Sequence, residues 1–181
     1  MEIEIFADVV CPWCYLGKRR LENALAAVDA DVVLRWRPLQ LDPNLPYQGQ
    51  PLLPWLAARF GGADRARQAM TQVTAAARAD GLVLDFDRAL IANTFDAHRL
   101  IWFADQPQAV VFGAGPDTQM ELVEALHRAH LTDGRDISTI EVLASVAASV
   151  GLDPDRLGRL LRSTEGVADV RGQIAHAHDL G

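Results

Sequence analysis

The sequence predicts an α/β fold in which a strand–helix–strand unit carries a large helical block. Two short strand patterns flank one amphipathic helix near the N-terminus, and the pattern from about residue 52 onward is almost wholly helical. The 181 residues are 50% hydrophobic and 23% charged, which excludes a disordered or collagen-like chain. The net charge of -7 argues against a nucleic-acid partner, because nucleic-acid binding depends on neutralising phosphates.

The first predicted unit covers two strands and the helix between them. Isoleucines alternate with glutamates over residues 2–7, which is typical of a short strand. An amphipathic helix follows from about Cys11 to Asp29, with Pro12 in its first turn, where the missing N–H costs nothing. Residues 32–37 form a second strand pattern that ends at a proline. A strand, a crossover helix and a strand predict a parallel pair.

Helices are predicted from the proline-rich connection at 42–51 to the end of the sequence. Ser138 and Glu141 have capping-box spacing, Asp153 precedes a proline at a first helical position, and Ser163 or Thr164 starts the last helix. A short extended piece is expected at 82–86. The other expected helices cover 53–60, 63–80, 93 or 94–105, 118–131 and 142–150.

Cysteine usage indicates where the chemistry lies. Acidic residues stand where a signal peptide would carry a basic region, so we expect no secretory signal and a cytoplasmic location. No apolar run approaches the roughly 20 residues of a membrane-spanning helix, so no membrane partner is expected. The two cysteines are Cys11 and Cys14. In a reducing compartment such a pair is redox-active or metal-binding rather than a structural staple.

The predicted helix start assigns different roles to the two cysteines. Unpaired N–H groups and the positive helix end favour the thiolate of Cys11 and can lower its pKa from about 8.5 into a range of about 3.5–7.5. Cys14 lies one turn further in, so Cys11 is expected to attack and Cys14 to resolve the mixed disulfide. Trp13 can shield the pair and present a surface to a thiol substrate. Lys18 is expected to be solvated and to add little.

Two more side chains are candidates for supporting the pair, each with a purely structural alternative. Asp8 is either a hydrogen-bonding loop residue or a carboxylate near Cys14 that accepts its proton during resolution. His98 is either a buried core histidine or a ring that faces the cysteines, polarising the thiolate or holding substrate. Asn93 is expected to cap a helix.

A zinc site is the alternative for the cysteine pair. A structural zinc ion usually needs four ligands, and the sequence has no further cysteine. His127 with His130, or His176 with His178, would have to complete the set. The strand before Cys11 and the helix after it favour thiol–disulfide chemistry, so no metal is predicted.

Longer motifs carry a family resemblance. Residues 6–22, 36–43, 93–100 and 134–137 together resemble the FrnE-like branch of the DsbA oxidoreductase family. The resemblance implies a thioredoxin fold with a large helical insertion: 1–41 as the N-terminal part of the thioredoxin-like domain, 42–162 as the insertion and 163–181 as a returning helix. It also implies dithiol–disulfide exchange with Cys11 as nucleophile and Cys14 resolving. Pro12, in the first helical turn, and Trp13, beside the pair, are further candidates for supporting the site.

Related proteins and the family's length leave alternatives open. 2-Hydroxychromene-2-carboxylate isomerases and kappa-class glutathione transferases share the fold but generally carry serine at the position of Cys11, so a glutathione- or mycothiol-dependent isomerase is the second hypothesis. A non-catalytic, zinc-stabilised binding module is the third.

No cofactor is expected beyond the redox-active pair, with a low-molecular-weight thiol as candidate co-substrate, and the partner is a thiol or disulfide substrate. The family continues into a cis-proline loop, two strands and a helix, which we expect to be missing here. A homodimer that completes the sheet is the alternative.

Overall fold

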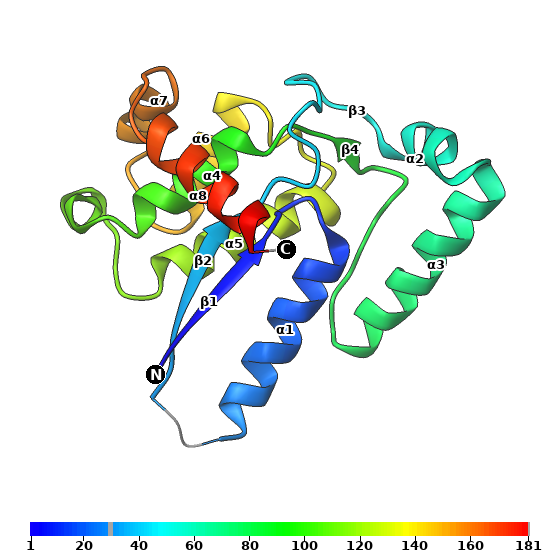
Figure 1. The fold of residues 1–181 in the computed structure, drawn as a ribbon, viewed down its shortest axis with the longest axis horizontal. Coiled ribbons are helices and arrows are strands. Elements are labelled where there is room, and N and C mark those ends of the chain that lie inside the picture. Colours follow the sequence, from blue (N-terminus) through cyan, green and yellow to red (C-terminus); the bar gives the residue numbers. More distant parts are fainter. Residues whose placement is uncertain (29–30, 181) are drawn as a thin grey trace.

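The predicted strand–helix–strand unit is present in the structure. A computed structural model describes residues 1–28 and 31–180. Strands β1 (Glu2–Ala7) and β2 (Val33–Pro38) pair in parallel, and α1 (Pro12–Ala26) connects them (Figure 1). The helix is shorter than expected, because it ends at Ala26, and the expected end at Asp29 lies outside the described residues.

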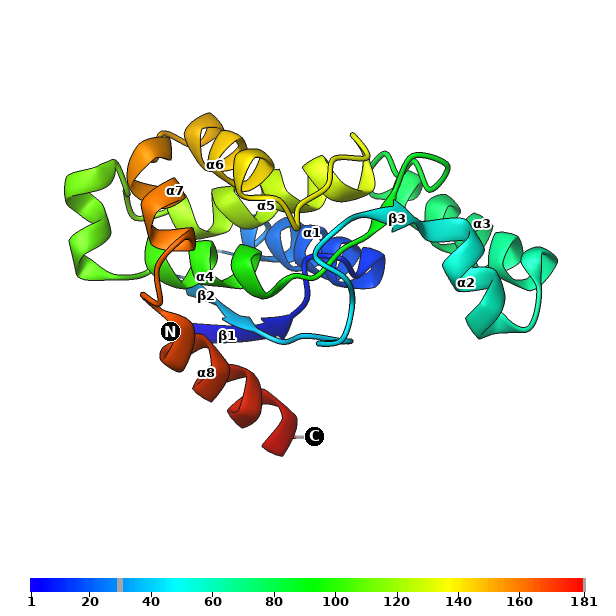
Figure 2. The same ribbon diagram turned by 90° about the horizontal axis from the view of Figure 1, so that it is seen from above.

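Helices cover both faces of the two-stranded sheet. Figure 2 shows α1 on one face and α8 (Val167–Asp179) on the other. Helix α8 contacts the sheet through β2, and its His176 ring meets the Phe6 ring of β1 edge-on at 6.1 Å between ring centroids. The α8 helix therefore lies beside the end of β1 that leads into the cysteine motif.

The last helix begins later than the sequence predicts. The expected start was Ser163 or Thr164, whereas α8 starts at Val167 after Gly166. The buried Arg99 side chain donates hydrogen bonds to the carbonyls of Ser163 and Glu165, at 2.8 and 2.7 Å. Because these carbonyls are already bonded across to another helix, the segment forms a turn instead of a first helical turn.

The helical block follows the predicted order. Its helices are α2 (Leu52–Phe60), α3 (Ala63–Ala79), α4 (Phe95–Ala104), α5 (Thr118–Leu131), α6 (Ile140–Ser149) and α7 (Pro154–Leu161), with a 3₁₀ helix η1 (Pro107–Phe112). Two-residue strands, β3 (Gln50–Pro51) and β4 (Leu90–Ile91), pair antiparallel and were not predicted. Within the described residues, none of the helices is long and apolar enough to cross a membrane.

One expected helix cap is wrong and another is confirmed. Helix α6 is capped by Thr139, whose hydroxyl accepts the Val142 N–H at 3.4 Å, and not by Ser138. Ser138 lies one residue before the N-cap, and its hydroxyl is turned toward the Asp136 carboxylate, to which it donates. Asp153 caps α7 as predicted, accepting two N–H groups of the first turn.

Two hydrophobic clusters hold the cysteine-bearing helix in place. The larger lies between the sheet and helices α4 to α7 and includes Trp36 and Phe103, which are almost fully buried. The smaller joins Tyr15 and Leu16 of α1 to Val73 of α3 and to the segment that follows it. Helix α1 is thus anchored to both parts of the helical block, which fixes the position of its N-terminus.

Candidate functional site

The two cysteines lie where β1 passes into α1. Cys11 is the N-cap residue of α1 with extended backbone (φ -84°, ψ 114°), and Pro12 occupies the first turn. The Cys11 N–H donates to the Asp8 carbonyl at 3.2 Å, while the Cys11 carbonyl accepts the Cys14 and Tyr15 N–H groups, both at 3.1 Å. Both cysteines are free thiols and half-buried. The predicted placement at a strand-to-helix junction is therefore present.

The pKa values of the two thiols are shifted in opposite directions. A hydrogen bond from the Cys14 thiol, with further ones from the main-chain N–H groups of Cys14 and Trp13, lowers the pKa of Cys11 to about 7 against the opposing effect of burial. The same hydrogen bond, together with burial and the charge of Cys11, raises the pKa of Cys14 far above its ordinary value. At neutral pH the negative charge of the pair therefore lies on Cys11.

Trp13 lies on the outside of the motif. Its side chain is 55% exposed, although Val9 and Tyr15 on either side are buried in the core. A large aromatic side chain in this position presents apolar surface beside the thiols. It does not seal the pair from solvent, so the shielding we expected of Trp13 is at most partial.

Asp8 and His98 form a buried pair behind the cysteines. Both side chains are almost completely buried, and His98 Nε2 lies 3.2 Å from Asp8 Oδ1. The other Asp8 oxygen accepts the main-chain N–H of Leu41 at 2.9 Å. Burial raises the pKa of Asp8, but the hydrogen bond and charge of His98, the Leu41 N–H and Thr94 together hold it below its usual value. Asp8 is therefore ionised, and His98 Nε2 carries the proton it donates to it.

The Asp8 carboxylate acts on both sulfurs. Its negative charge raises the pKa of Cys11 and of Cys14, while a hydrogen bond from the Asp8 main chain partly opposes this at Cys14. His98 Nδ1 is buried without a hydrogen-bond partner in the described structure. An ionised carboxylate that acts on a thiol of raised pKa is an arrangement suited to accepting a proton.

A layer of amides behind Asp8 was not identified as part of the site from the sequence. Gln40 donates to Asn93 Oδ1 and to Thr94 Oγ1, both at 3.3 Å, and Asn93 donates to the carbonyls of Pro43 and Leu45. Asn93 also accepts the Phe95 N–H, the first of α4, but the N-cap position of α4 is Thr94, so the expectation that Asn93 is the cap residue is wrong by one position. These bonds tie the loop that carries Leu41 to the helix that carries His98. The only sequence signal was that both segments fall in the motifs that resemble the family.

The histidines that could have completed a zinc site are not gathered around the cysteines. His127 and His130 are buried in α5, and burial lowers their pKa values to about 3 and about 4. The His127 ring stacks on Tyr15 with 4.7 Å between centroids. His176 instead contacts Phe6 on the other face of the sheet. Across the described residues, no group of three or more histidine, cysteine, aspartate or glutamate side chains could hold a metal ion.

The expectation that Lys18 is solvated is wrong. Lys18 is 4% exposed, and its ammonium group lies 2.6 Å from Glu22 and 2.8 Å from Glu124 of α5. Glu124 also accepts hydrogen bonds from Tyr15 and Arg19, at 2.7 and 2.8 Å. The charge of Lys18 is thus neutralised locally, and the residue joins α1 to α5.

Comparisons with known proteins agree with this geometry. Residues 2–181 match the DSBA-like thioredoxin domain. A probable DsbA oxidoreductase from Streptomyces coelicolor is 32% identical, with a TM-score of 0.87 over 100% of this chain and 76% of that one. The cytosolic disulfide reductase DsbM from Pseudomonas aeruginosa (19% identical, TM-score 0.59, 99% and 78% coverage) and a 2-hydroxychromene-2-carboxylate isomerase (13%, 0.67, 98% and 79%) share the fold. The chain belongs to the DSBA-like thioredoxin domain family and has its α/β thioredoxin-like fold with a helical insertion.

Proposed function

We propose that this chain is a thiol–disulfide oxidoreductase of the FrnE-like branch that acts in the cytoplasm through Cys11 and Cys14. One observation carries the proposal: Cys11 is the N-cap residue of α1 and Cys14 lies one turn further in, with the Cys14 N–H bonded to the Cys11 carbonyl at 3.1 Å. In this arrangement the neighbouring thiol lowers the pKa of Cys11 to about 7, and that of Cys14 is raised. A nucleophile half ionised at neutral pH, next to a thiol held in reserve, is what stepwise disulfide exchange requires.

The exchange proceeds in two steps. The Cys11 thiolate attacks one sulfur of a substrate disulfide, forming a mixed disulfide and releasing the other substrate sulfur as a thiolate. Cys14 then loses its proton and attacks Cys11 Sγ, which forms the Cys11–Cys14 disulfide and releases the second substrate thiolate. Two electrons pass from the dithiol to the substrate disulfide, and the two thiol protons end on the substrate thiols. The reverse sequence oxidises a substrate dithiol.

Asp8 and His98 serve the second step in this proposal. The Cys14 proton must leave before Cys14 can attack, and the Asp8 charge acts directly on that thiol. Asp8 accepts the proton from Cys14 and, because its own pKa is low, releases it to the departing substrate thiolate or to solvent. His98 holds the carboxylate in place through the 3.2 Å hydrogen bond. Pro12 fixes the helix start, and Trp13 offers apolar surface to the substrate.

Trapping the mixed disulfide tests the order of attack. Cys14→Ala, incubated with glutathione disulfide, should retain one glutathione on Cys11, seen as a mass increase that dithiothreitol reverses. Cys11→Ser should retain none and should lose reduction of insulin disulfides. Glutathione held equally by both variants, or insulin reduction that survives Cys11→Ser, would refute the assignment.

Removing the Asp8 charge tests proton transfer separately from attack. In Asp8→Asn the mixed disulfide should form faster at about pH 6, because the charge that raises the pKa of Cys11 is gone. Resolution should slow by about ten- to a hundredfold, the lower part of the range for general acid–base catalysis. If both steps change in the same direction, Asp8 is only structural. Asp96→Asn on α4 is the control, since Asp96 instead pairs with Arg99.

The isomerase hypothesis has its own outcome in these experiments. A double variant, Cys11→Ser with Cys14→Ser, cannot exchange disulfides. If it still binds reduced glutathione and catalyses isomerisation of 2-hydroxychromene-2-carboxylate, the cysteines are not the reacting groups. In that case the thiol co-substrate would be the reagent, and the dithiol proposal would be wrong.

A further inference from the structure

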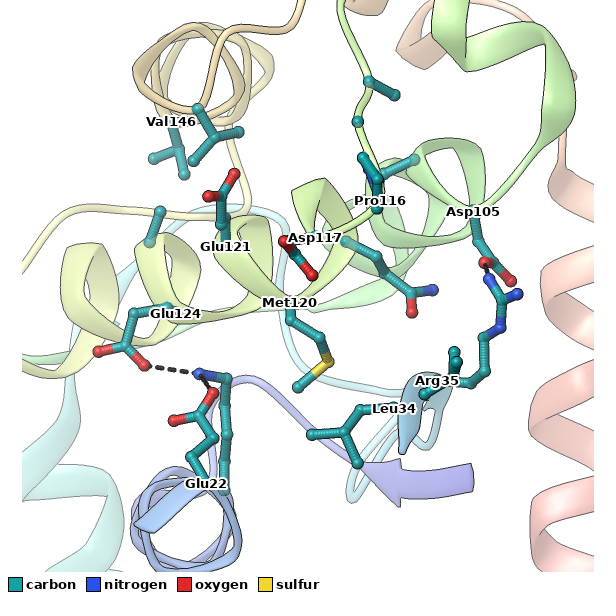
Figure 3. A pocket seen from close by; sticks show the side chains of 18 of the residues that line it. Glu22, Leu34, Arg35, Asp105, Pro116, Asp117, Met120, Glu121, Glu124 and Val146 are labelled. Atoms are coloured by element: carbon teal, nitrogen blue, oxygen red, sulfur yellow. Dashed lines mark hydrogen bonds and ion pairs between the residues drawn. The ribbon is translucent and has the colours of Figure 1, made fainter. Parts of the chain in front are cut away.

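A second surface feature lies away from the cysteines. A groove of about 1570 Å³ opens between α1, β2 and α5. Among the described residues, its lining includes none of the predicted site residues, which are Asp8, Cys11, Pro12, Trp13, Cys14 and His98. Figure 3 shows Leu34 of β2 and Met120 of α5 pointing into the same space. We call this space the β2 groove. Its size is sufficient for several residues of an extended chain.

The outer edge of β2 borders the β2 groove. The Val33 N–H bonds to Met1 on the β1 side, at 2.9 Å. The main chain of Trp36 points the other way, where the Gln119 side chain accepts its N–H at 2.9 Å and donates to its carbonyl at 3.2 Å. Main-chain groups alternate along a strand, so those of Leu34 share the outward direction of Trp36.

Gln119 covers the outer edge of β2 at Trp36 and leaves it open at Leu34, two residues earlier. In the described part of the chain, no side chain bonds to the main chain of Leu34 as Gln119 bonds to Trp36. The N–H and carbonyl of Leu34, which itself lines the β2 groove, are therefore available on the outer edge. An open pair of this kind is the contact through which an extended peptide adds to a sheet.

The charges around the β2 groove indicate which peptide would fit. Seven acidic and five basic side chains line it, so the lining is net negative. Lys18 and Arg35 already form ion pairs, with Glu124 and Asp105 respectively, and Figure 3 shows Glu124 and Arg35 on opposite sides of this space. Asp117 and Glu121 of the α5 segment are exposed, and neither forms an ion pair within the described residues. A basic ligand would supply the missing partners.

We propose that the β2 groove binds an extended, basic segment of a partner protein, which adds to the outer edge of β2. The segment bonds through its main chain to Leu34, places apolar side chains against Met120 and presents lysine or arginine to Asp117 and Glu121. A second copy of this chain is the less suitable occupant, because it carries a net charge of -7 and would bring acids to an acidic surface. The docking site is separate from the dithiol chemistry and does not depend on it.

A short synthetic peptide tests the assignment on the whole protein. An acetylated, fluorescently labelled peptide of about six residues, alternating lysine and valine, has the length of an ordinary strand. It should bind in an anisotropy titration, and its counterpart with glutamate for lysine should not. Methylating the peptide nitrogens along one edge should weaken binding by about tenfold or more, because it removes the hydrogen bonds of strand addition.

Matched variants locate the binding. Asp117→Asn and Glu121→Gln should each weaken binding by about two- to fivefold, which corresponds to one exposed ion pair. Asp64→Asn on α3 removes an exposed acid outside the β2 groove and should have no effect. Binding that is insensitive to N-methylation or equal in all three variants overturns the proposal. So does sedimentation showing a dimer of this chain that the peptide must dissociate before it binds.

Discussion

Replacing Cys14 by alanine should shift the ionisation of Cys11. The hydrogen bond from the Cys14 thiol is the largest cause that lowers the pKa of Cys11 from its ordinary value to about 7. Alanine removes this bond but keeps the main-chain N–H of residue 14, and the Trp13 N–H also remains. Burial, which raises the pKa of Cys11, is then opposed only by these two donors. The pKa should therefore rise toward its ordinary value without necessarily reaching it.

The size of the effect follows from the two limits. With a pKa of about 7, half of Cys11 is thiolate at neutral pH. A rise of about one to two pH units would reduce the thiolate fraction at neutral pH to between about 9% and 1%. Alkylation would slow by less than this, because a thiolate of higher pKa is the stronger nucleophile. The midpoint of the pH profile is therefore a better readout than a single rate.

The assay is iodoacetamide alkylation of the reduced protein across the pH range, followed by mass spectrometry. Trp13→Phe is the matched control, since the main-chain donor of residue 13 survives the change and the midpoint should stay at about 7. A Cys14→Ala midpoint within about 0.3 units of the parent would refute the reasoning. It would mean that the helix N-terminus, and not the neighbouring thiol, sets the acidity of Cys11.

Three further predictions concern stability, each measured by urea unfolding. Gly113→Ala should cost about 3 kcal/mol or more, since a Cβ there would lie 2.2 Å from the Gly151 carbonyl oxygen, whereas Gly151→Ala, also at positive φ but in open space, should cost about 1 kcal/mol. Arg99→Met should cost about 3–5 kcal/mol, because it frees the buried carbonyls that Arg99 holds. Glu124→Gln should cost about 2 kcal/mol at neutral pH. Burial raises the pKa of Glu124, but its hydrogen bonds lower the pKa overall. The parent protein should therefore lose this stabilisation as the pH falls below about 4.5, whereas Glu124→Gln, which has no carboxylate there, should not show this loss.

Local patterns predicted most of the helices and the parallel strand pair. Helix α5 has the predicted bounds, and Asp153 with the following proline marked the start of α7 correctly. These elements are determined by neighbouring residues: apolar spacing, a capping side chain and a stop. The errors have the opposite origin. Ser138 has the spacing of a cap, but Asp136 competes for its hydroxyl. Thr164 could start a helix, but a distant arginine holds the carbonyls next to it.

The pairing of Asp8 with His98 could not be predicted from such patterns. The two residues are separated by 90 positions and meet only because the helical block folds back over the end of β1. Each had a structural and a functional reading in the sequence, and burial alone would favour the structural one. The contact favours the functional interpretation, because the buried carboxylate that bonds to the buried imidazole also raises the pKa of both thiols. Tertiary contacts of this kind leave no periodic signal.

Glu124 connects the chemistry at one end of α1 with the groove at its side. It accepts hydrogen bonds from Tyr15, Lys18 and Arg19, which follow Cys14 within two turns of the helix. The bonds fix the rotation of α1 about its axis, and that rotation determines where the sulfur atoms face. The same carboxylate lines the β2 groove. Because its charge is satisfied by these donors, a basic ligand in the groove would be drawn to the unpaired acids of α5, and docking could occur without loosening the helix that carries Cys11.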